Sequence, residues 1–238
     1  KYVYLDIMYP WQNIYLFEVL KTYRFDHIWT FLDTWTRHMV DDLKFDPLKV
    51  TTMVHGIDFE RFVDISPGEA KMKAGFKPDD YLVVNMNRNS TRKMWETTIK
   101  AFLELLKREN MNPRIKLFCG CRSYWNRGVD IGMTAKSECL RRGMDVNRVL
   151  NNHIFISPKP ELLTDAEVNN IYNAGDVGLS TTQSEGFGLT PVEHMYLNRP
   201  QIVTGIPAFK ETMGPYAHFV EPKVWIRVGE MEPHDGEG

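Results

Sequence analysis

The sequence alternates short apolar runs with longer amphipathic stretches, and this alternation limits the fold more than any other feature. Runs typical of strands lie at residues 2–7, 27–32, 50–54, 81–85, 115–119, 153–156, 176–180 and 200–203, with weaker ones at 218–220 and 225–228. Helical patterns lie between them at residues 11–23, 35–43, 67–74, 94–108, 133–142, 165–173 and 191–197. Strands that alternate with such helices form βαβ units, whose parallel sheet is covered on both faces. We therefore predict an α/β fold with a doubly wound parallel sheet.

The distribution of these units predicts more than one domain. The chain has 238 residues, roughly one and a half times the usual ~150 residues of a domain. From about residue 78 onward there are enough units for one complete α/β domain. The first 55 residues supply three strands and two helices, which are too few for a domain of their own. We expect a fragment of a two-domain protein, with an incomplete domain at 1–55, a linker at 56–77, a complete domain at 78–228 and a flexible tail at 229–238.

Composition and charge narrow the class of protein. Hydrophobic residues make up 43% of the chain and the net charge is −2, which excludes a disordered chain and gives no electrostatic reason to expect nucleic acid. No stretch approaches ~18 consecutive apolar residues, so no transmembrane segment is expected. The first residues do not resemble a secretory signal. The odd number of cysteines is typical of reduced thiols, so we expect a globular cytoplasmic protein; its oligomeric state is not indicated.

One loop concentrates cations where a strand of the sheet ends. Ligands of open α/β sheets bind beyond the carboxyl ends of the strands. The run at 81–85 is followed by Asn-Arg-Asn-Ser-Thr-Arg-Lys, which places Arg88, Arg92 and Lys93 at a predicted helix start. Helix starts attract anions, so cations in the first turn are locally unfavourable and suggest an anionic ligand. The alternative is a solvated basic loop.

A second loop follows the run at 176–180 and carries two glycines and a carboxylate. Gly186 and Gly188 allow backbone amides to approach a ligand closely. Glu185 lies beside them in a predicted turn and has no evident structural role. We therefore treat Glu185 as a functional candidate.

The end of this second loop has a structural explanation as well as a functional one. Thr190 is the predicted N-cap of the following helix, with Pro191 at the first helical position. Thr-x-x-Glu is a capping box, in which Glu193 accepts a hydrogen bond from the amide of Thr190. Glu193 could thus be a ligand-binding residue or a cap.

Two further features each have two possible interpretations, and the spacing of the potential metal ligands argues against a metal site. The loop from Ser157 to Pro160 could hold a planar ring or a charge, or it could be an ordinary Pro-rich connection. Arg122, after the run at 115–119, has the same two interpretations. The cysteine and histidine spacings do not match a zinc site, and Asp-x-Asp does not occur. We expect no metal and no cofactor.

Four motifs resemble, in the right order, those of retaining glycosyltransferases of family GT4. Residues 185–193, Glu-Gly-Phe-Gly-Leu-Thr-Pro-Val-Glu, resemble the E-x7-E signature of that family. Arg88 and Lys93 look like its Arg/Lys pair for the donor diphosphate. Residues 54–62 resemble its interdomain segment, and residues 171–177 resemble its Tyr-x-x-Ala-Asp-Val motif with Gly175 inserted. Residues 85–89 and the region of Trp225 look most like the branch carried by large DNA viruses.

The resemblance implies the GT-B fold, which has two Rossmann-like domains. Residues 1–55 would then be the end of the acceptor-side domain, and residues 78–228 the domain that binds the nucleotide-sugar donor. Most of the acceptor domain and the C-terminal helix that crosses back to it are not in this sequence. The resemblance therefore implies a partial enzyme, with any peripheral membrane contact made through the rest of the acceptor domain.

The resemblance also implies residue roles. Glu193 would accept hydrogen bonds from the ribose hydroxyls, and Glu185 from a hydroxyl of the donor sugar. Arg88 and Lys93 would stabilise the leaving diphosphate in place of a metal ion. Further donor contacts would come from Gly186, Phe187, Gly188, Leu189 and Thr190, while Arg122, Pro158 and Lys159 would flank the base.

The implied reaction is transfer of a hexose from a nucleotide-diphosphate sugar to a sugar or glycan acceptor, with retention and without metal. GDP-mannose and UDP-glucose are both compatible donors. Two alternatives remain open: a non-catalytic module that binds nucleotide sugars, and a nucleotide-sugar epimerase on the same GT-B fold.

Overall fold

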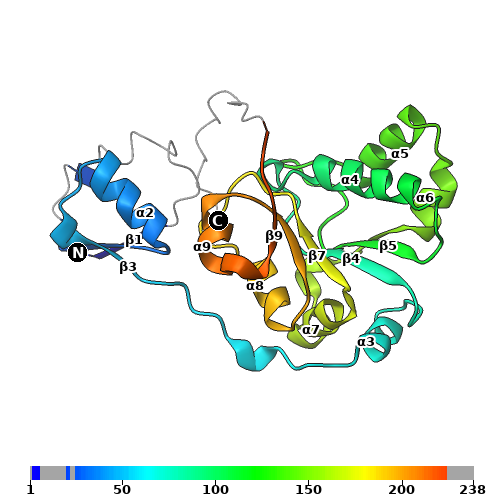
Figure 1. Cartoon of the computed structure of the whole chain (residues 1–238), viewed down its shortest axis with the longest axis horizontal. Helices are drawn as coiled ribbons and strands as arrows, with labels where there is room; N and C mark the ends of the chain where they lie inside the picture. Colours follow the sequence, from blue (N-terminus) through cyan, green and yellow to red (C-terminus); the bar gives the residue numbers. More distant parts are fainter. Residues whose placement is uncertain (1, 6–19, 22–24, 224–238) are drawn as a thin grey trace.

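The computed structural model describes residues 2–5, 20–21 and 25–223, which form two parallel sheets (Figure 1). The first sheet has the order β1-β2-β3, with strands β1 (Tyr2–Leu5), β2 (His27–Thr30) and β3 (Val50–Thr52). The second sheet has the order β6-β5-β4-β7-β8-β9. Its strands are β4 (Tyr81–Asn85), β5 (Ile115–Cys119), β6 (Ile154–Ile156), β7 (Val177–Ser180), β8 (Gln201–Thr204) and β9 (His218–Val220). The predicted α/β fold with parallel sheets is confirmed.

Helices connect the strands of the second sheet and cover both of its faces. They are α3 (Pro67–Lys73), α4 (Trp95–Arg108), α5 (Ile131–Arg141), α6 (Val146–Asn152), α7 (Asp165–Ala174), α8 (Leu189–Tyr196) and α9 (Pro207–Met213). Alternate residues of β4 point to opposite faces: Val83 packs in a cluster with residues of α4 and α5, whereas Leu82 and Val84 pack with residues of α3 and α7. No helix among the described residues is long and apolar enough to cross a membrane.

The strand order of the second sheet creates a topological switch point between β4 and β7. From β4 the chain builds outward to β5 and β6, and it then returns to β7 and builds outward in the other direction. The two strands are neighbours, with Val83 paired to Val177 and Val84 to Gly178. In sheets of this kind the connections that leave the two strands diverge, and ligands bind in the crevice between them, beyond the carboxyl ends of the strands.

The first sheet and its helix α2 (Asp33–Arg37) pack against α8 and α9 of the second unit. Trp35 and Phe209 belong to one buried cluster that joins the two parts. The start of α2 has no cap of its own, and Glu211 of α9 takes that role: its carboxylate accepts from the amides of Asp33 at 2.7 Å and Thr34 at 2.9 Å. The described first part of the chain is therefore held against the second by both apolar and polar contacts.

Several element boundaries differ from the prediction. The helix predicted at 35–43 is α2 followed by a π-helical turn at 38–42. Helices α6 and α9 were not predicted, because each has only seven residues and lies next to turn-forming residues. The tail at 229–238, the weak strand at 225–228 and most of the helix at 11–23 lie outside the described residues. The predicted domain boundaries remain a prediction.

Candidate functional site

The cation loop and the Glu185 loop meet at the carboxyl ends of β4 and β7. A 3-10 turn at Thr91–Lys93 follows β4, and residues 181–188 follow β7. The backbone amide of Gln183 donates to the carbonyl of Arg92 at 2.8 Å, and the hydroxyl of Thr181 donates to the carbonyl of Lys93 at 3.2 Å. Two loops about 90 residues apart in the sequence thus form one structure at the switch point.

Within this structure, Glu185 is paired with two cations. The ammonium of Lys93 forms an ion pair with one carboxylate oxygen, and the guanidinium of Arg92 lies 2.8 Å from the other. Arg92 also donates to the carbonyl of Ser184. Lys93 is 9% exposed and Glu185 is 6% exposed, so these charges are largely removed from water. Glu185 is thus the carboxylate that balances both cations.

The cations do not lie in the first turn of an α-helix as predicted. Helix α4 begins at Trp95, after Met94 in a left-handed conformation with φ 53°. Arg92 and Lys93 lie in the preceding 3-10 turn. The left-handed conformation of Met94 changes the direction of the backbone before α4 begins. The side chains of Arg92 and Lys93 therefore point toward the loop after β7 rather than along the helix.

The electrostatic environment of Lys93 favours a further negative charge. Burial lowers the pKa of Lys93, the nearby Glu185 opposes this, and Arg92 and Arg88 lower the pKa further. Arg88 itself is exposed and makes no side-chain hydrogen bond or ion pair with the part of the chain that the structure describes. Its guanidinium is therefore available to a ligand, whereas Lys93 must exchange its present partners.

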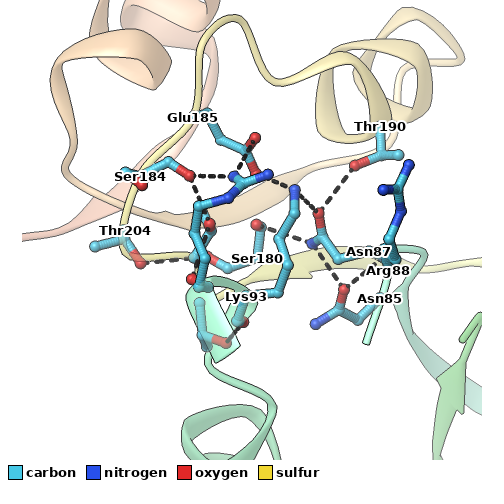
Figure 2. Close-up of polar contacts among 12 residues, drawn as sticks. Asn85, Asn87, Arg88, Lys93, Ser180, Ser184, Glu185, Thr190 and Thr204 are labelled. Atoms are coloured by element: carbon cyan, nitrogen blue, oxygen red, sulfur yellow. Dashed lines mark hydrogen bonds and ion pairs between the residues drawn. The ribbon is translucent and has the colours of Figure 1, made fainter. Parts of the chain in front are cut away.

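Asn87 joins the two loops and the start of α8 (Figure 2). Its side-chain amide nitrogen donates to Asn85 at 2.8 Å and to Ser180 at 3.0 Å. Its oxygen accepts from the ammonium of Lys93 at 2.9 Å and the hydroxyl of Thr190 at 3.3 Å. Asn87 is a site residue that was not predicted. The sequence feature that could have indicated it is the pair of asparagines, Asn85 and Asn87, at the end of an apolar strand, because a buried side-chain amide needs hydrogen-bond partners.

Helix α8 begins two residues earlier than predicted, and its cap is a glycine. Gly188 is the N-cap with φ 94° and ψ 53°, and the helix starts at Leu189. The prediction of Thr190 as N-cap and Pro191 as first helical residue is therefore wrong. A side chain at position 188 would also place its Cβ 2.4 Å from the ring of Phe209. Gly188 thus starts the helix, whose first backbone amides have no intrahelical acceptor and are suited to an anion.

Glu193 does not form the capping box either. One of its carboxylate oxygens accepts from the hydroxyl of Tyr172 at 3.0 Å. Burial raises the pKa of Tyr172 well above its usual value, with a further contribution from Glu193, so the phenol stays protonated and donates. The second oxygen of Glu193 makes no hydrogen bond within the described residues, which leaves it available to a ligand hydroxyl.

Two residues from the first part of the chain, one in α2 and one after β3, contact the turn that follows Glu185. The indole nitrogen of Trp35 donates to the carbonyl of Gly186 at 3.1 Å, and Trp35 is 2% exposed. The ring of His55 lies 5.7 Å from the ring of Phe187. The sequence offered no sign of these contacts, because the partners lie more than 130 residues apart.

The residues predicted to flank a base lie at the ends of β5 and β6. Arg122, Pro158 and Lys159 are exposed, and Arg122 forms an ion pair with Glu161 at 3.1 Å. The side chain of Asn89 donates to the carbonyl of Arg122 at 3.0 Å and so fixes this loop to the end of β4. Arg122 therefore lies beside the cation loop, whereas Pro158 and Lys159 lie further along the same edge of the sheet, after β6; none of the three contacts Glu185.

The described residues contain no group of three or more His, Cys, Asp or Glu side chains that could hold a metal ion. The three cysteines are free and buried, and burial raises the pKa of Cys121 to about 12.

Comparison with known proteins agrees with the geometry. A family model described as glycosyl transferases group 1 matches residues 68–228. Among solved structures, the chain is similar to a glycosyltransferase from Rickettsia africae, with 17% identity, a TM-score of 0.70, and coverage of 94% of this chain and 56% of that one. It is also similar to Alr3699/HepE from Anabaena in complex with UDP-glucose, with 14% identity, a TM-score of 0.70, and coverage of 93% and 58%.

A third similar structure is the C-terminal domain of a glycosyl transferase group 1 family protein, LpcC, from Francisella tularensis. It has 20% identity and a TM-score of 0.53, with coverage of 71% of this chain and 81% of that one. At these identities the likeness concerns the fold, which is the GT-B type. The chain spans a little over half the length of the first two structures. A comparison with curated proteins gave no match.

Proposed function

The chain belongs to the glycosyl transferases group 1 family, and on this basis we propose that it carries the donor site of a retaining hexosyltransferase of family GT4. The observation that carries the proposal is the meeting of Lys93, Arg92 and Glu185 at the switch point between β4 and β7. Buried cations beside the free amides of a helix start are suited to a diphosphate, which is the leaving group of a nucleotide-sugar donor.

The first step is an exchange of partners at Lys93. A donor diphosphate entering the crevice competes with Glu185 for the ammonium of Lys93, while Arg88 and the first amides of α8 supply further donors. Charge that develops on the diphosphate as the sugar leaves is stabilised by these prearranged groups. Release of Glu185 from Lys93 frees a carboxylate oxygen to accept from a hydroxyl of the donor sugar.

The nucleoside would lie further along the same edge of the sheet. Tyr172 fixes one oxygen of Glu193 and leaves the other for the ribose hydroxyls. The base would lie near Arg122, Pro158 and Lys159 at the ends of β5 and β6. The UDP-glucose in the Anabaena structure makes a uridine donor the first to test, with GDP-mannose as the second. A sugar or glycan would be the acceptor.

The proposed reaction does not use a metal ion. Lys93, Arg92 and Arg88 would supply the positive charge that a divalent cation supplies in other phosphate sites. EDTA should then leave the rate unchanged, and a rate that requires added Mg²⁺ would contradict this part of the proposal.

A second candidate is a binding module without transfer. The pairing of Glu185 with both Lys93 and Arg92 favours it, because a carboxylate that keeps these partners cannot accept from a sugar hydroxyl. A nucleotide-sugar epimerase on the same fold is a third candidate, and it would act without an acceptor.

The test incubates the protein with each donor, with and without a panel of sugar acceptors. We expect release of nucleoside diphosphate that requires an acceptor, and a product whose anomeric configuration by NMR equals that of the donor. Arg88→Gln combined with Lys93→Met should abolish transfer, whereas the control Lys100→Gln, on α4, should not. Wild-type transfer by the double variant would refute the proposed site.

The remaining outcomes separate the alternatives. Donor binding without turnover would favour the binding module. Acceptor-independent release of nucleotide together with an altered sugar would favour the epimerase. A product of inverted configuration would refute the assignment to retaining enzymes while leaving the donor site intact.

A further inference from the structure

A second concavity lies at the opposite edge of the second sheet from the candidate donor site. It has a volume of about 330 Å³ and is lined by residues of three segments, 77–80, 113–116 and 148–153. These segments lead into β4, β5 and β6, so the hollow lies at the amino ends of the strands. Strands rise ~3.3 Å per residue, so the length of the sheet separates it from the crevice. Its volume is that of a small-molecule site.

The hollow carries an excess of positive charge. Four cations and two carboxylates line it: Lys77, Arg114, Lys116, Arg148, Asp79 and Asp80. Both carboxylates have partners, since Asp80 accepts from the amide of Lys77 at 3.0 Å and Asp79 lies 3.3 Å from Arg114. Four positive and two negative charges leave +2, in a chain whose net charge is −2.

Two of these cations have only neutral partners. The ammonium of Lys116 donates to the carbonyl of Asn152 at 2.7 Å, and the guanidinium of Arg148 donates to the carbonyl of Met111 at 3.0 Å. Neither forms an ion pair with a carboxylate of the described chain. An ammonium has three N–H donors and a guanidinium has five, so most of their donors are available to an anion.

A buried histidine adds an acceptor to the same hollow. His153 is 1% exposed and lines the cavity. Its Nδ1 donates to the carbonyl of Ile115 at 2.8 Å, so Nε2 of the neutral ring is an acceptor. Burial lowers the pKa of His153, and Lys116 and Arg148 lower it further, which keeps the ring neutral. No hydrogen bond to Nε2 is made by the residues that the structure describes.

We propose that this hollow binds a phosphomonoester, with the phosphate held by Lys116 and Arg148 and a ligand hydroxyl donating to Nε2 of His153. The cations require a negative group and the imidazole requires a donor, and a phosphorylated sugar or polyol supplies both. The same phosphomonoester, with neighbouring hydroxyls, is presented by a free sugar phosphate and by the headgroup of a phosphatidylinositol phosphate. The site does not depend on the donor crevice, so refuting this proposal would leave the proposed function untouched, and the reverse also holds.

The test follows the imidazole signals of His153 by NMR while this chain is titrated with inorganic phosphate and with glucose 6-phosphate. We expect saturable shifts, with glucose 6-phosphate binding more tightly than phosphate. In Lys116→Gln combined with Arg148→Gln, the affinity should fall at least tenfold. The matched control, Lys100→Gln combined with Arg108→Gln, removes two cations of α4 that do not line the hollow and should leave the affinity unchanged.

A second arm separates the two sources of the ligand. Sedimentation with phosphatidylcholine vesicles that contain phosphatidylinositol 4-phosphate, lost in the same double variant, would identify a lipid headgroup. Glucose 6-phosphate binding without vesicle binding would identify a free metabolite. Absence of any saturable shift of His153 and of vesicle binding in the folded wild-type chain would overturn the proposal. Phosphate affinity that survives in the double variant would also overturn it, because the anion would then be bound elsewhere, such as at Lys93.

Discussion

The ion pair between Lys93 and Glu185 should contribute measurably to the stability of the ligand-free chain. The two side chains are 11% and 8% exposed, so water screens them weakly. Unit charges about 4 Å apart attract by about 4 kcal/mol at an effective dielectric constant of 20. Arg92 and Asn87 remain as partners when either residue is replaced, which reduces the loss. We therefore expect a coupling free energy of about 2–3 kcal/mol.

A double-mutant cycle measures this coupling. The free energy of unfolding in urea is determined at low ionic strength for the wild type, Glu185→Gln, Lys93→Met and the double variant. The control cycle uses Glu69→Gln and Lys73→Met, a pair on α3 whose side chains are 53% and 55% exposed; its coupling should be about 0.3–0.5 kcal/mol. If the buried pair couples no more strongly than the exposed one, the account of the cation loop is wrong.

Three further predictions concern the surroundings of the site. Gly188→Ala should destabilise the chain by roughly 2–4 kcal/mol in urea unfolding, because alanine is strained at this φ and clashes with the ring of Phe209; a change below 0.5 kcal/mol would contradict the geometry. Burial lowers the pKa of His194 to about 3. The unfolded chain therefore takes up this proton first, and stability is lost as the pH falls from about 6.5 toward 3. By pH 5 the loss in the free energy of unfolding should be about 2 kcal/mol. In His194→Gln, urea unfolding at pH 7 and pH 5 should show a smaller loss of stability than in the wild type. An equal loss in the variant would refute the assignment of this pKa to His194. Trp35→Phe removes the hydrogen bond to Gly186 and should weaken calorimetric binding of a nucleotide sugar about five- to tenfold while sparing the nucleoside diphosphate; equal losses for both would indicate a merely structural role.

Much of the second sheet could be predicted because its strands are apolar on both faces. The prediction for β4 and β5 matches the structure residue for residue, since Val83 and its neighbours pack under helices on opposite sides of the sheet. The two loops of the site could be located by the general rule that ligands bind at the carboxyl ends of strands. That rule needs only the strand positions, which the apolar runs supply.

The side-chain contacts of the site could not be predicted, because they join residues far apart in the sequence. The pairing of Arg92 with Glu185 spans 93 residues, and the hydrogen bond from Trp35 to Gly186 spans 151. The failure at Thr190 has a different cause. A local capping rule was applied where Gly188, in a left-handed conformation, already starts the helix.

The central claim is that the crevice between β4 and β7 is a metal-independent site for a nucleotide-sugar donor. Titration calorimetry of this chain with UDP, GDP, UDP-glucose and GDP-mannose, with EDTA present, tests it most directly. The account predicts saturable binding of one base, weakened at least tenfold by Lys93→Met and by Glu193→Ala, and unchanged by Lys100→Gln. Absence of nucleotide binding by the folded chain, or binding that the Lys93 and Glu193 variants leave intact, would contradict it.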